Sequence, residues 1–247
     1  MAYDPSAESE PRSQPVGFGR ATETAEHAGR SAMSVKFMNQ VFGWMAGGLA
    51  ASGAVSYAVL SNDALLQTVS GWMLPLIILE LVVVFGLSAA LHKMSSMAAA
   101  GAFLFYSALN GLTMGVILAM YTGASVANVF FVTAGTFAAM ATIGATTKRD
   151  LTGMGSFLMM GVIAILIASV VNFFVGSGAL NWAISVLGAL IFTGLTAYDA
   201  QRFKRLGYSG FATEREAGQM AIRGALNLYL DFVNMFLFML RLFGDRR

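Results

Sequence analysis

The chain has 247 residues, of which 57% are hydrophobic and 11% are charged, and its formal net charge is +2. Soluble domains carry about a quarter charged residues, so this composition excludes an ordinary water-soluble protein. The absence of cysteine excludes a disulfide framework and cysteine-ligated metals, and the small net charge gives no support to nucleic-acid binding.

Residues 1–32 differ from the rest of the chain. They contain three of the four prolines, five acidic residues and three arginines, a composition typical of a disordered tail. Acidic residues and prolines stand where a secretory signal would have its basic and apolar regions, so we expect no signal peptide here. Residues 33–247 are predicted to form one membrane domain.

From Met33 onward, the apolar runs are long enough to cross a bilayer as helices, which takes about 20 residues each. They are too long for strands and lack the alternation of a lipid-facing barrel, so helices are the expected spanning elements. The predicted helices cover residues 34–60, 71–91, 97–120, 126–145, 153–175, 180–199 and 223–243.

Basic residues alternate between the connections of these helices. The first, third and fifth connections contain no lysine or arginine, whereas the tail and the even-numbered connections contain Arg12, Arg20, Arg30, Lys36, Lys93, Lys148, Arg149, Arg202, Lys204, Arg205, Arg215 and Arg223. The positive-inside rule then predicts a cytoplasmic amino terminus. Seven full crossings would leave Arg241, Arg246 and Arg247 outside, so the sequence leaves open whether the last helix crosses simply.

Three acidic residues lie within the predicted spans. Charged groups at membrane depth are costly, so such residues usually face the protein interior or water and have a partner. Glu80 stands at the middle of LPLIILELVVVFGL. Two interpretations remain open for Glu80: a protonated acid hydrogen-bonded to another helix near Asn110, or a residue of an ion pathway.

Asp199 ends the predicted helix 180–199, in the stretch GLTAYDAQRFKR, and Arg202 follows three residues later. An ion pair between these two residues at the cytoplasmic surface is one interpretation. The other is a functional role, because a carboxylate at the carboxyl end of a helix faces the unfavourable pole of the helix dipole.

Asp231 lies inside the last apolar run, between Leu230 and Phe232. Arg223 on the same helix is about 12 Å away along its axis, so a group on another helix must satisfy this acid, and Asp199 could reach the same depth. Two carboxyl groups in a low-dielectric site do not both ionise easily, so we expect the pair to share one proton. Without the proton, the pair would suit transient Ca²⁺ binding, and no resident cofactor is expected.

The segments GLTAYDAQRFKR and LNLYLDFVNMFLFMLRLFG, with ELVVVFGLSAAL and SALNGLTMGV upstream, resemble the bacterial branch of the Bax inhibitor-1 family. The resemblance runs over residues 33–247. It implies an all-α polytopic membrane protein whose seven transmembrane helices form two three-helix layers around a central carboxyl-terminal helix. It also implies a passive, pH-regulated calcium leak, with Asp199 and Asp231 as the diaspartyl pH sensor and Glu80 as the membrane glutamate of the second span.

The chain departs from the family pattern at two places. After Gly-Leu-Ser, many relatives have an arginine that can latch onto the aspartate pair, whereas this chain has Ala89 and Ala90, and Lys93 is the expected substitute for the latch. After the first aspartate, Ala200 stands where relatives often have threonine.

Three functions fit these observations. The first, which we favour, is a calcium leak of the bacterial inner membrane, gated by protonation of Asp199 and Asp231 and in contact with lipid. The second is a membrane-embedded regulator of the stress response or of a membrane protease, with a membrane-protein partner and no transport activity. The third is an intramembrane aspartyl protease, which we disfavour because the second aspartate, in LYLDF, lacks the glycine-flanked setting of those enzymes. We therefore expect no enzymatic activity.

Overall fold

The computed structural model describes residues 16–247, and it contains helices and no strand within that range. This confirms the predicted all-α class. The elements are α1 (Val16–Leu60), α2 (Asp63–Gly71), α3 (Met73–Ala90), the 3₁₀ turn η1 (Leu91–Lys93), α4 (Ser96–Leu118), α5 (Gly123–Thr146), α6 (Thr152–Val175), α7 (Gly178–Ser209) and α8 (Glu214–Phe243).

Six helical segments of the described chain are long and apolar enough to cross a membrane: Met73–Lys93, Ser96–Leu118, Gly123–Thr146, Thr152–Val175, Gly178–Ser209 and Glu214–Phe243. Helix α1, predicted as a seventh span, is not among them. Its second half contains glycines, serines, Trp44 and Tyr57, and these residues lower its mean hydropathy. The outer faces of α3 and α6 expose large apolar side chains such as Phe85, Phe157 and Phe173, as a lipid environment favours.

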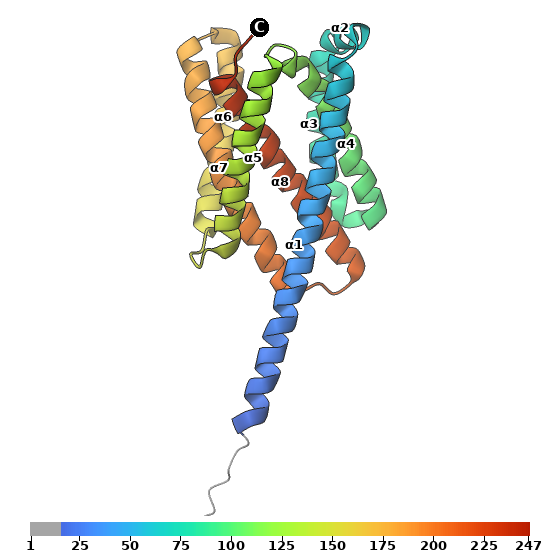
Figure 1. Ribbon diagram of the computed structural model, residues 1–247, viewed down its shortest axis with the longest axis vertical. Coiled ribbons are helices and arrows are strands. Elements are labelled where there is room, and N and C mark those ends of the chain that lie inside the picture. The colour runs from blue at the N-terminus through green and yellow to red at the C-terminus, as the bar shows by residue number, and fades with distance from the viewer. Residues whose placement is uncertain (1–15) are drawn as a thin grey trace, which may run out of the picture.

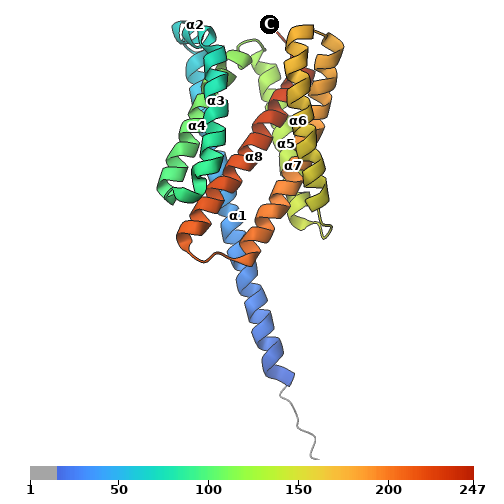
Figure 2. The ribbon, with the colours of Figure 1, turned by 180° about the vertical axis from the view of Figure 1, so that it is seen from behind.

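Helix α8 runs obliquely through the middle of the bundle (Figures 1 and 2). Helices α1, α3 and α4 lie on one side of it, and α5, α6 and α7 lie on the other. Helix α8 packs against α7, α1, α5 and α4. It therefore supplies many of the most deeply buried large side chains, namely Ile222, Leu226, Leu228, Tyr229, Met235 and Leu240.

Helix α1 begins at Val16, well before the predicted start at residue 34, and its first turns project from the bundle (Figure 1). Of the tail predicted to be disordered, residues 1–15 lie outside the described residues and residues 16–32 are helical. One reason for the helix is local, because Arg30 and Glu26 form an ion pair of 2.6 Å at the spacing of one helical turn.

Helix α7 continues to Ser209, ten residues beyond the predicted end at Asp199. The basic stretch after Asp199 stays helical because its small and apolar residues are buried: Phe203 is 1% exposed, and Gly207 packs against Phe37 of α1. The prediction that Asp199 ends its helix is therefore wrong. The argument from the pole of the helix dipole does not apply to an aspartate this far inside.

Helix α8 begins at Glu214, nine residues before the predicted start at residue 223. Thr213 caps it, since its hydroxyl oxygen accepts a hydrogen bond of 3.1 Å from the backbone amide of Glu216. The Glu216 carboxylate accepts one of 2.9 Å from the amide of Ala212, the residue before the cap. Asp231 consequently lies 17 residues after the first residue of α8 rather than near its beginning.

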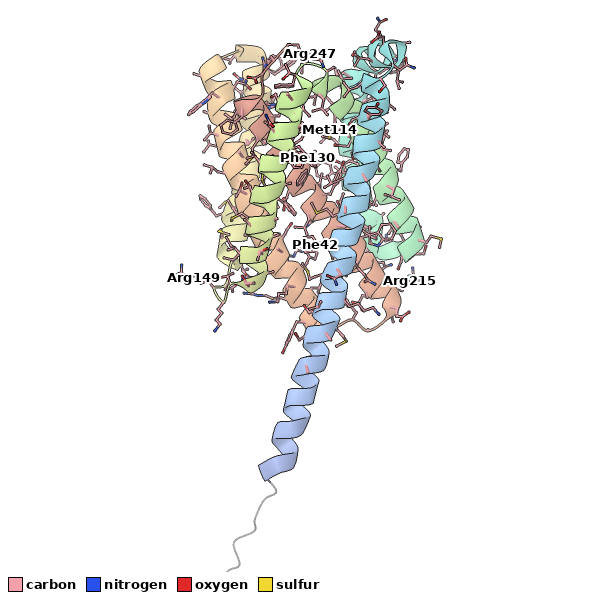
Figure 3. The ribbon with its side chains drawn as sticks, viewed as in Figure 1. Phe42, Met114, Phe130, Arg149, Arg215 and Arg247 are labelled. Atoms are coloured by element: carbon pink, nitrogen blue, oxygen red, sulfur yellow. The ribbon has the colours of Figure 1, made fainter. Side chains whose placement is uncertain are left out.

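The two ends of the bundle differ. Turn η1 and the α5–α6 and α7–α8 connections lie at the end from which α1 projects, which we call the basic end, and Arg149 and Arg215 mark it in Figure 3. Arg247 lies at the opposite end (Figure 3). Helix α8 thus runs from one end of the bundle to the other, and the carboxyl terminus lies at the end opposite the basic end.

The carboxyl-terminal residues are fixed to the α4–α5 connection. The Thr122 amide donates to the Asp245 carbonyl at 3.0 Å, and the Asp245 amide donates to the Ser125 hydroxyl at 2.8 Å. The Arg246 guanidinium lies 5.9 Å from the centre of the Tyr121 ring. These contacts give the basic carboxyl end partners on the protein itself.

Candidate functional site

Asp199 of α7 and Asp231 of α8 lie together at the contact between these two helices. Both are buried, with 6% and 5% of their surface exposed, and their carboxyl groups are close enough for their charges to interact. The structure thus brings together two acids that the sequence predicted to meet.

The two carboxyl groups have different partners. Asp199 has a cation, because Nη1 of Arg202 lies 3.9 Å from its Oδ1, and the side chain of Asn227 on α8 interacts with its carboxyl group. Asp231 lies one turn after Asn227, and its buried Oδ2 atom has no hydrogen-bond partner among the described residues. Buried polar atoms nearly always have a partner, so this oxygen is the exceptional feature of the site.

Arg202 connects the pair to solvent. Its side chain is 47% exposed, whereas the side chain of Asp199 is 9% exposed. The ion pair between these residues, one of the two interpretations of Asp199, is therefore present, but its acid is buried rather than at the surface. The site combines one partly compensated carboxylate with one that has no basic partner in the described part of the chain.

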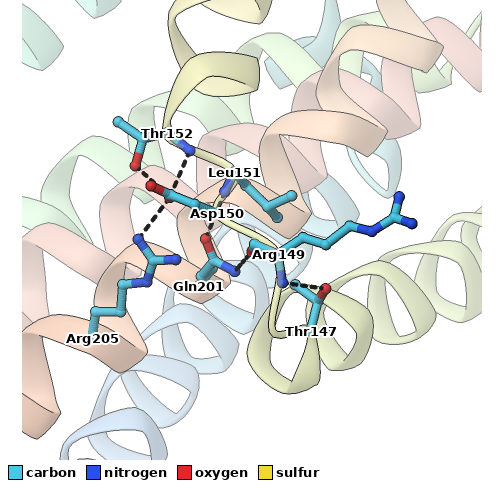
Figure 4. A network of polar contacts seen from close by, with 7 residues as sticks. All are labelled: Thr147, Arg149, Asp150, Leu151, Thr152, Gln201 and Arg205. Atoms are coloured by element: carbon cyan, nitrogen blue, oxygen red, sulfur yellow. Dashed lines mark hydrogen bonds and ion pairs between the residues drawn. The ribbon is translucent and has the colours of Figure 1, made fainter.

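The α5–α6 connection is attached to α7 just beyond Asp199 (Figure 4). The amide oxygen of Gln201 accepts a hydrogen bond of 2.9 Å from the backbone of Leu151, and its amide nitrogen donates one of 2.7 Å to the carbonyl of Arg149. Gln201 is itself buried. This clamp holds the connection against the helix that carries the first aspartate.

Asp150 completes the clamp on its exposed side (Figure 4). Its Oδ1 accepts from the hydroxyl of Thr152 and from Nη1 of Arg205, each at 2.7 Å. These bonds, with that to the Thr152 side chain as the largest cause, lower the pKa of Asp150 from 3.8 to about 2. Asp150 therefore stays ionised throughout the neutral range.

Glu80 belongs to a different part of the bundle. Thr113 on α4 donates its hydroxyl to Oε1 of Glu80 at 2.8 Å. The expected neighbour, Asn110, lies one turn earlier on α4, and its Oδ1 is buried without a partner among the described residues. The carboxyl of Glu80 interacts electrostatically with Tyr106 and Tyr229.

A hydroxyl cluster between α1, α4 and α8 was missed in the sequence. The hydroxyls of Ser52 and Tyr229 are 2.6 Å apart, and Ser52 also reaches the carbonyl of Ser107 at 2.7 Å. Two weak signals were available in the sequence. The first is that Ser52 and Ser56 are spaced by one helical turn. The second is that Tyr229 precedes Asp231 by two residues, so Tyr229 and Asp231 must face different sides of one helix.

The sequence of this chain is similar to those of a known protein family. A sequence model of the family described as "Inhibitor of apoptosis-promoting Bax1" matches residues 34–247. The chain belongs to the Bax inhibitor-1 family. The match spans nearly all of the region over which the sequence resembled that family.

Several bacterial proteins are similar to this chain. The inner membrane protein YbhL of Escherichia coli (strain K12) is 44% identical over 217 residues, covering 85% of this chain and 92% of YbhL. An uncharacterized protein of Deinococcus radiodurans is 42% identical over 210 residues, covering 85% and 90%. An uncharacterized protein of Caulobacter vibrioides is 40% identical over 247 residues, covering 93% and 98%. With the apolar helices described above, this likeness makes the chain an integral membrane protein.

Lys93, the expected substitute for the latch of other Bax inhibitor-1 family members, ends η1. It is exposed, and its backbone carbonyl accepts a hydrogen bond of 3.4 Å from Arg215. No ion pair joins Lys93 to Asp199 or Asp231 within the described residues. The cation paired with the site is Arg202.

The acids of the site are too few for a closed metal centre. Within residues 16–247, no three histidine, cysteine, aspartate or glutamate side chains gather as a metal site. Calcium takes about six to eight oxygen ligands, so Asp199 and Asp231 could supply only part of a calcium shell. Water and amide or carbonyl oxygens would have to supply the rest.

Proposed function

We propose that the protein is a pH-sensitive passive calcium leak of the bacterial inner membrane, gated by protonation of Asp199 and Asp231. The observation that carries this proposal is the buried Oδ2 of Asp231, which has no partner among the described residues and whose charged neighbour is a second acid. A carboxylate in such surroundings is strongly disfavoured until it binds a proton or a cation.

The topology belongs to the same proposal. Helix α1 would serve as a seventh span through its residues 34–60, which pack along α4. The groups α1, α3, α4 and α5, α6, α7 would then form two three-helix layers around α8. The basic end, with the amino terminus, would face the cytoplasm, since lysine and arginine favour that side.

Gating follows from competition for the same oxygen atoms. A proton shared by Asp199 and Asp231 removes one of two like charges at the contact between α7 and α8. When the proton leaves, the two carboxylates repel each other or hold a calcium ion between them. Proton concentration therefore sets how often calcium can occupy the site. Glu80, on the other side of α8, would offer a second oxygen site along the path.

Calcium flux into liposomes tests the proposal. We expect dye-reported influx through the reconstituted protein to vary with pH, and the Asp231→Asn variant to lose that variation. Asp63→Asn is the matched control, because Asp63 is an exposed acid on α2, far from the basic end. A flux that changes with neither pH nor Asp231→Asn would contradict the pH-gated channel. It would favour the membrane-embedded regulator, in which the acids have a structural role and a partner protein co-purifies.

A further inference from the structure

An apolar groove opens between α1 and α5. Its volume is about 540 Å³, and Phe232 of α8 forms part of its wall. Phe42 of α1 and Phe130 of α5 border it (Figure 3). All of its lining residues except two threonines are apolar: Phe42, Met45, Ala46, Leu49, Phe130, Ala134, Phe137, Ala138, Ala141, Thr142, Ala145, Thr146 and Phe232.

The two threonines do not make the groove polar. The hydroxyl of Thr142 donates to the carbonyl of Ala138 at 2.8 Å, and that of Thr146 donates to the carbonyl of Thr142 at 2.7 Å. Both donors are thus used within α5. A water in a cavity needs about two to four polar partners, so the groove is suited to a hydrocarbon chain and not to water or a polar solute.

A second, basic pocket of about 390 Å³ adjoins the groove and shares Ala145 with it. Its cations are Lys204 and Arg205 of α7. Arg205 is paired with Asp150, so its charge is already balanced. The Lys204 ammonium donates to the carbonyl of Ala145 at 2.5 Å and forms no ion pair within the described residues. An ammonium group has three donors, so two remain for an anion.

Three helices hold this cation at the foot of the groove. Ser34 of α1 donates its hydroxyl to the carbonyl of Lys204 at 2.9 Å, and Ala145 of α5 binds the ammonium of the same residue. Both walls of the groove therefore converge on Lys204 at the basic end. The apolar groove therefore ends, at the basic end of the bundle, beside the positive charge of Lys204.

We propose that the groove and the basic pocket together bind one anionic phospholipid from the leaflet at the basic end. One acyl chain lies between α1 and α5, and the phosphate contacts Lys204. A free anion would use the basic pocket alone and leave the groove unexplained.

Photo-crosslinking in liposomes tests this site. The protein is reconstituted in phosphatidylcholine vesicles with a trace of phosphatidylglycerol whose acyl chain carries a diazirine, and labelled peptides are mapped by mass spectrometry. We expect label to concentrate in residues 130–146 and 42–49. Ala138→Phe, which fills the groove, should strongly reduce that label. Ala139→Phe, at the next exposed position outside the groove, should not.

A second variant tests the charge without filling the groove. Lys204→Gln keeps a donor for the Ala145 carbonyl and removes the positive charge, so phosphatidylglycerol labelling should fall about fivefold, equivalent to about 1 kcal/mol for one basic residue at an anionic surface. Lys148→Gln, an exposed cation outside the basic pocket, is the control and should leave labelling unchanged.

Four outcomes would overturn the proposal. Equal labelling by photoreactive phosphatidylcholine and phosphatidylglycerol would mean that the site ignores headgroup charge. Equal loss with Ala138→Phe and Ala139→Phe would indicate ordinary surrounding lipid. Loss of labelling on adding inorganic phosphate would indicate a soluble anion as the ligand. A protein crosslinked at residues 130–146 in place of lipid would indicate a partner helix.

Discussion

Helix α8 carries two buried polar clusters on different faces, and they are built in opposite ways. Toward α1 and α4, the Tyr229 hydroxyl lies 2.6 Å from that of Ser52, and Ser52 also reaches the carbonyl of Ser107. Toward α7, Asp231 faces another acid, Asp199, and its Oδ2 has no partner in the described part of the chain. The first cluster is neutral and satisfied, whereas the second is acidic and incomplete.

The difference separates what holds the helices together from what can respond to the surroundings. A hydrogen bond between membrane helices contributes about 0.6 kcal/mol on average, and a neutral cluster changes little with pH. An acidic pair with an unpaired oxygen contributes nothing obvious to packing, yet a single proton or cation changes its charge. We therefore expect substitutions in the two clusters to affect different measurements.

The largest expected effect is coupling between Asp199 and Asp231. If the two share one proton, Asp199→Asn and Asp231→Asn should each abolish the pH dependence of calcium flux, and the double variant should add nothing further. Thermal unfolding of the same four proteins should give a coupling free energy of about 0.5–3 kcal/mol. Additive effects of the two substitutions would mean that the carboxyls act separately.

A second effect concerns the close approach of α5 and α7 near the acidic cluster. A methyl group at Gly144 would overlap the backbone carbonyl of Ala197, so Gly144→Ala should destabilise the protein by about 1–3 kcal/mol. Gly135 on the same helix has open space around it. Gly135→Ala is therefore the control and should be neutral or slightly stabilising in a thermal melt in detergent. Equal melting temperatures for the two variants would show that α7 can shift away from α5.

A smaller loss of stability is expected in the hydroxyl cluster. Tyr229→Phe removes the hydroxyl that meets Ser52 and should lower the free energy of unfolding by about 0.6–1.7 kcal/mol, the range for hydrogen bonds between membrane helices. Its calcium flux should keep the pH dependence of the unaltered protein. Tyr57→Phe is the control, because Tyr57 is 73% exposed on α1. A flux that loses its pH dependence in Tyr229→Phe would contradict the division of labour between the two faces of α8.

The sequence was sufficient for features that depend on composition along the chain. Apolar runs predicted the helical class, and an acid in the run around Asp231 predicted a partner on another helix. Asp199 was the only acid at a suitable depth on the preceding helix, so their meeting could be inferred. The family was visible for the same reason, because its motifs surround these two acids.

Features that depend on contacts between helices could not be inferred. Hydropathy ended α7 at Asp199 because basic residues follow, yet Phe203 and Gly207 keep the helix going by packing against other elements. Thr113 and Asn110 both have polar side chains that could bind an acid, and only the crossing of α3 and α4 decides that Thr113 binds Glu80. The groove beside Phe232 depends on where α1 and α5 separate, and the hydrophobic periodicity of the sequence does not predict that position.

The smallest expected effect concerns Asp150 in the exposed clamp, and it tests which acids cause the pH dependence of flux. The pKa of Asp150 is lowered from 3.8 to about 2, so its contribution to stability is complete above pH 3.8 and is lost only as the pH falls through about 2. Asp150 therefore stays charged wherever the buried pair is expected to respond.

Asp150→Asn should speed amide hydrogen exchange at Leu151 and Thr152 while leaving the melting temperature nearly unchanged, with Asp63→Asn as the control. Because Asp150 does not titrate in the neutral range, the pH dependence of flux should survive its substitution. Loss of that dependence would indicate that the pH sensor lies in the α5–α6 connection and not in the buried pair.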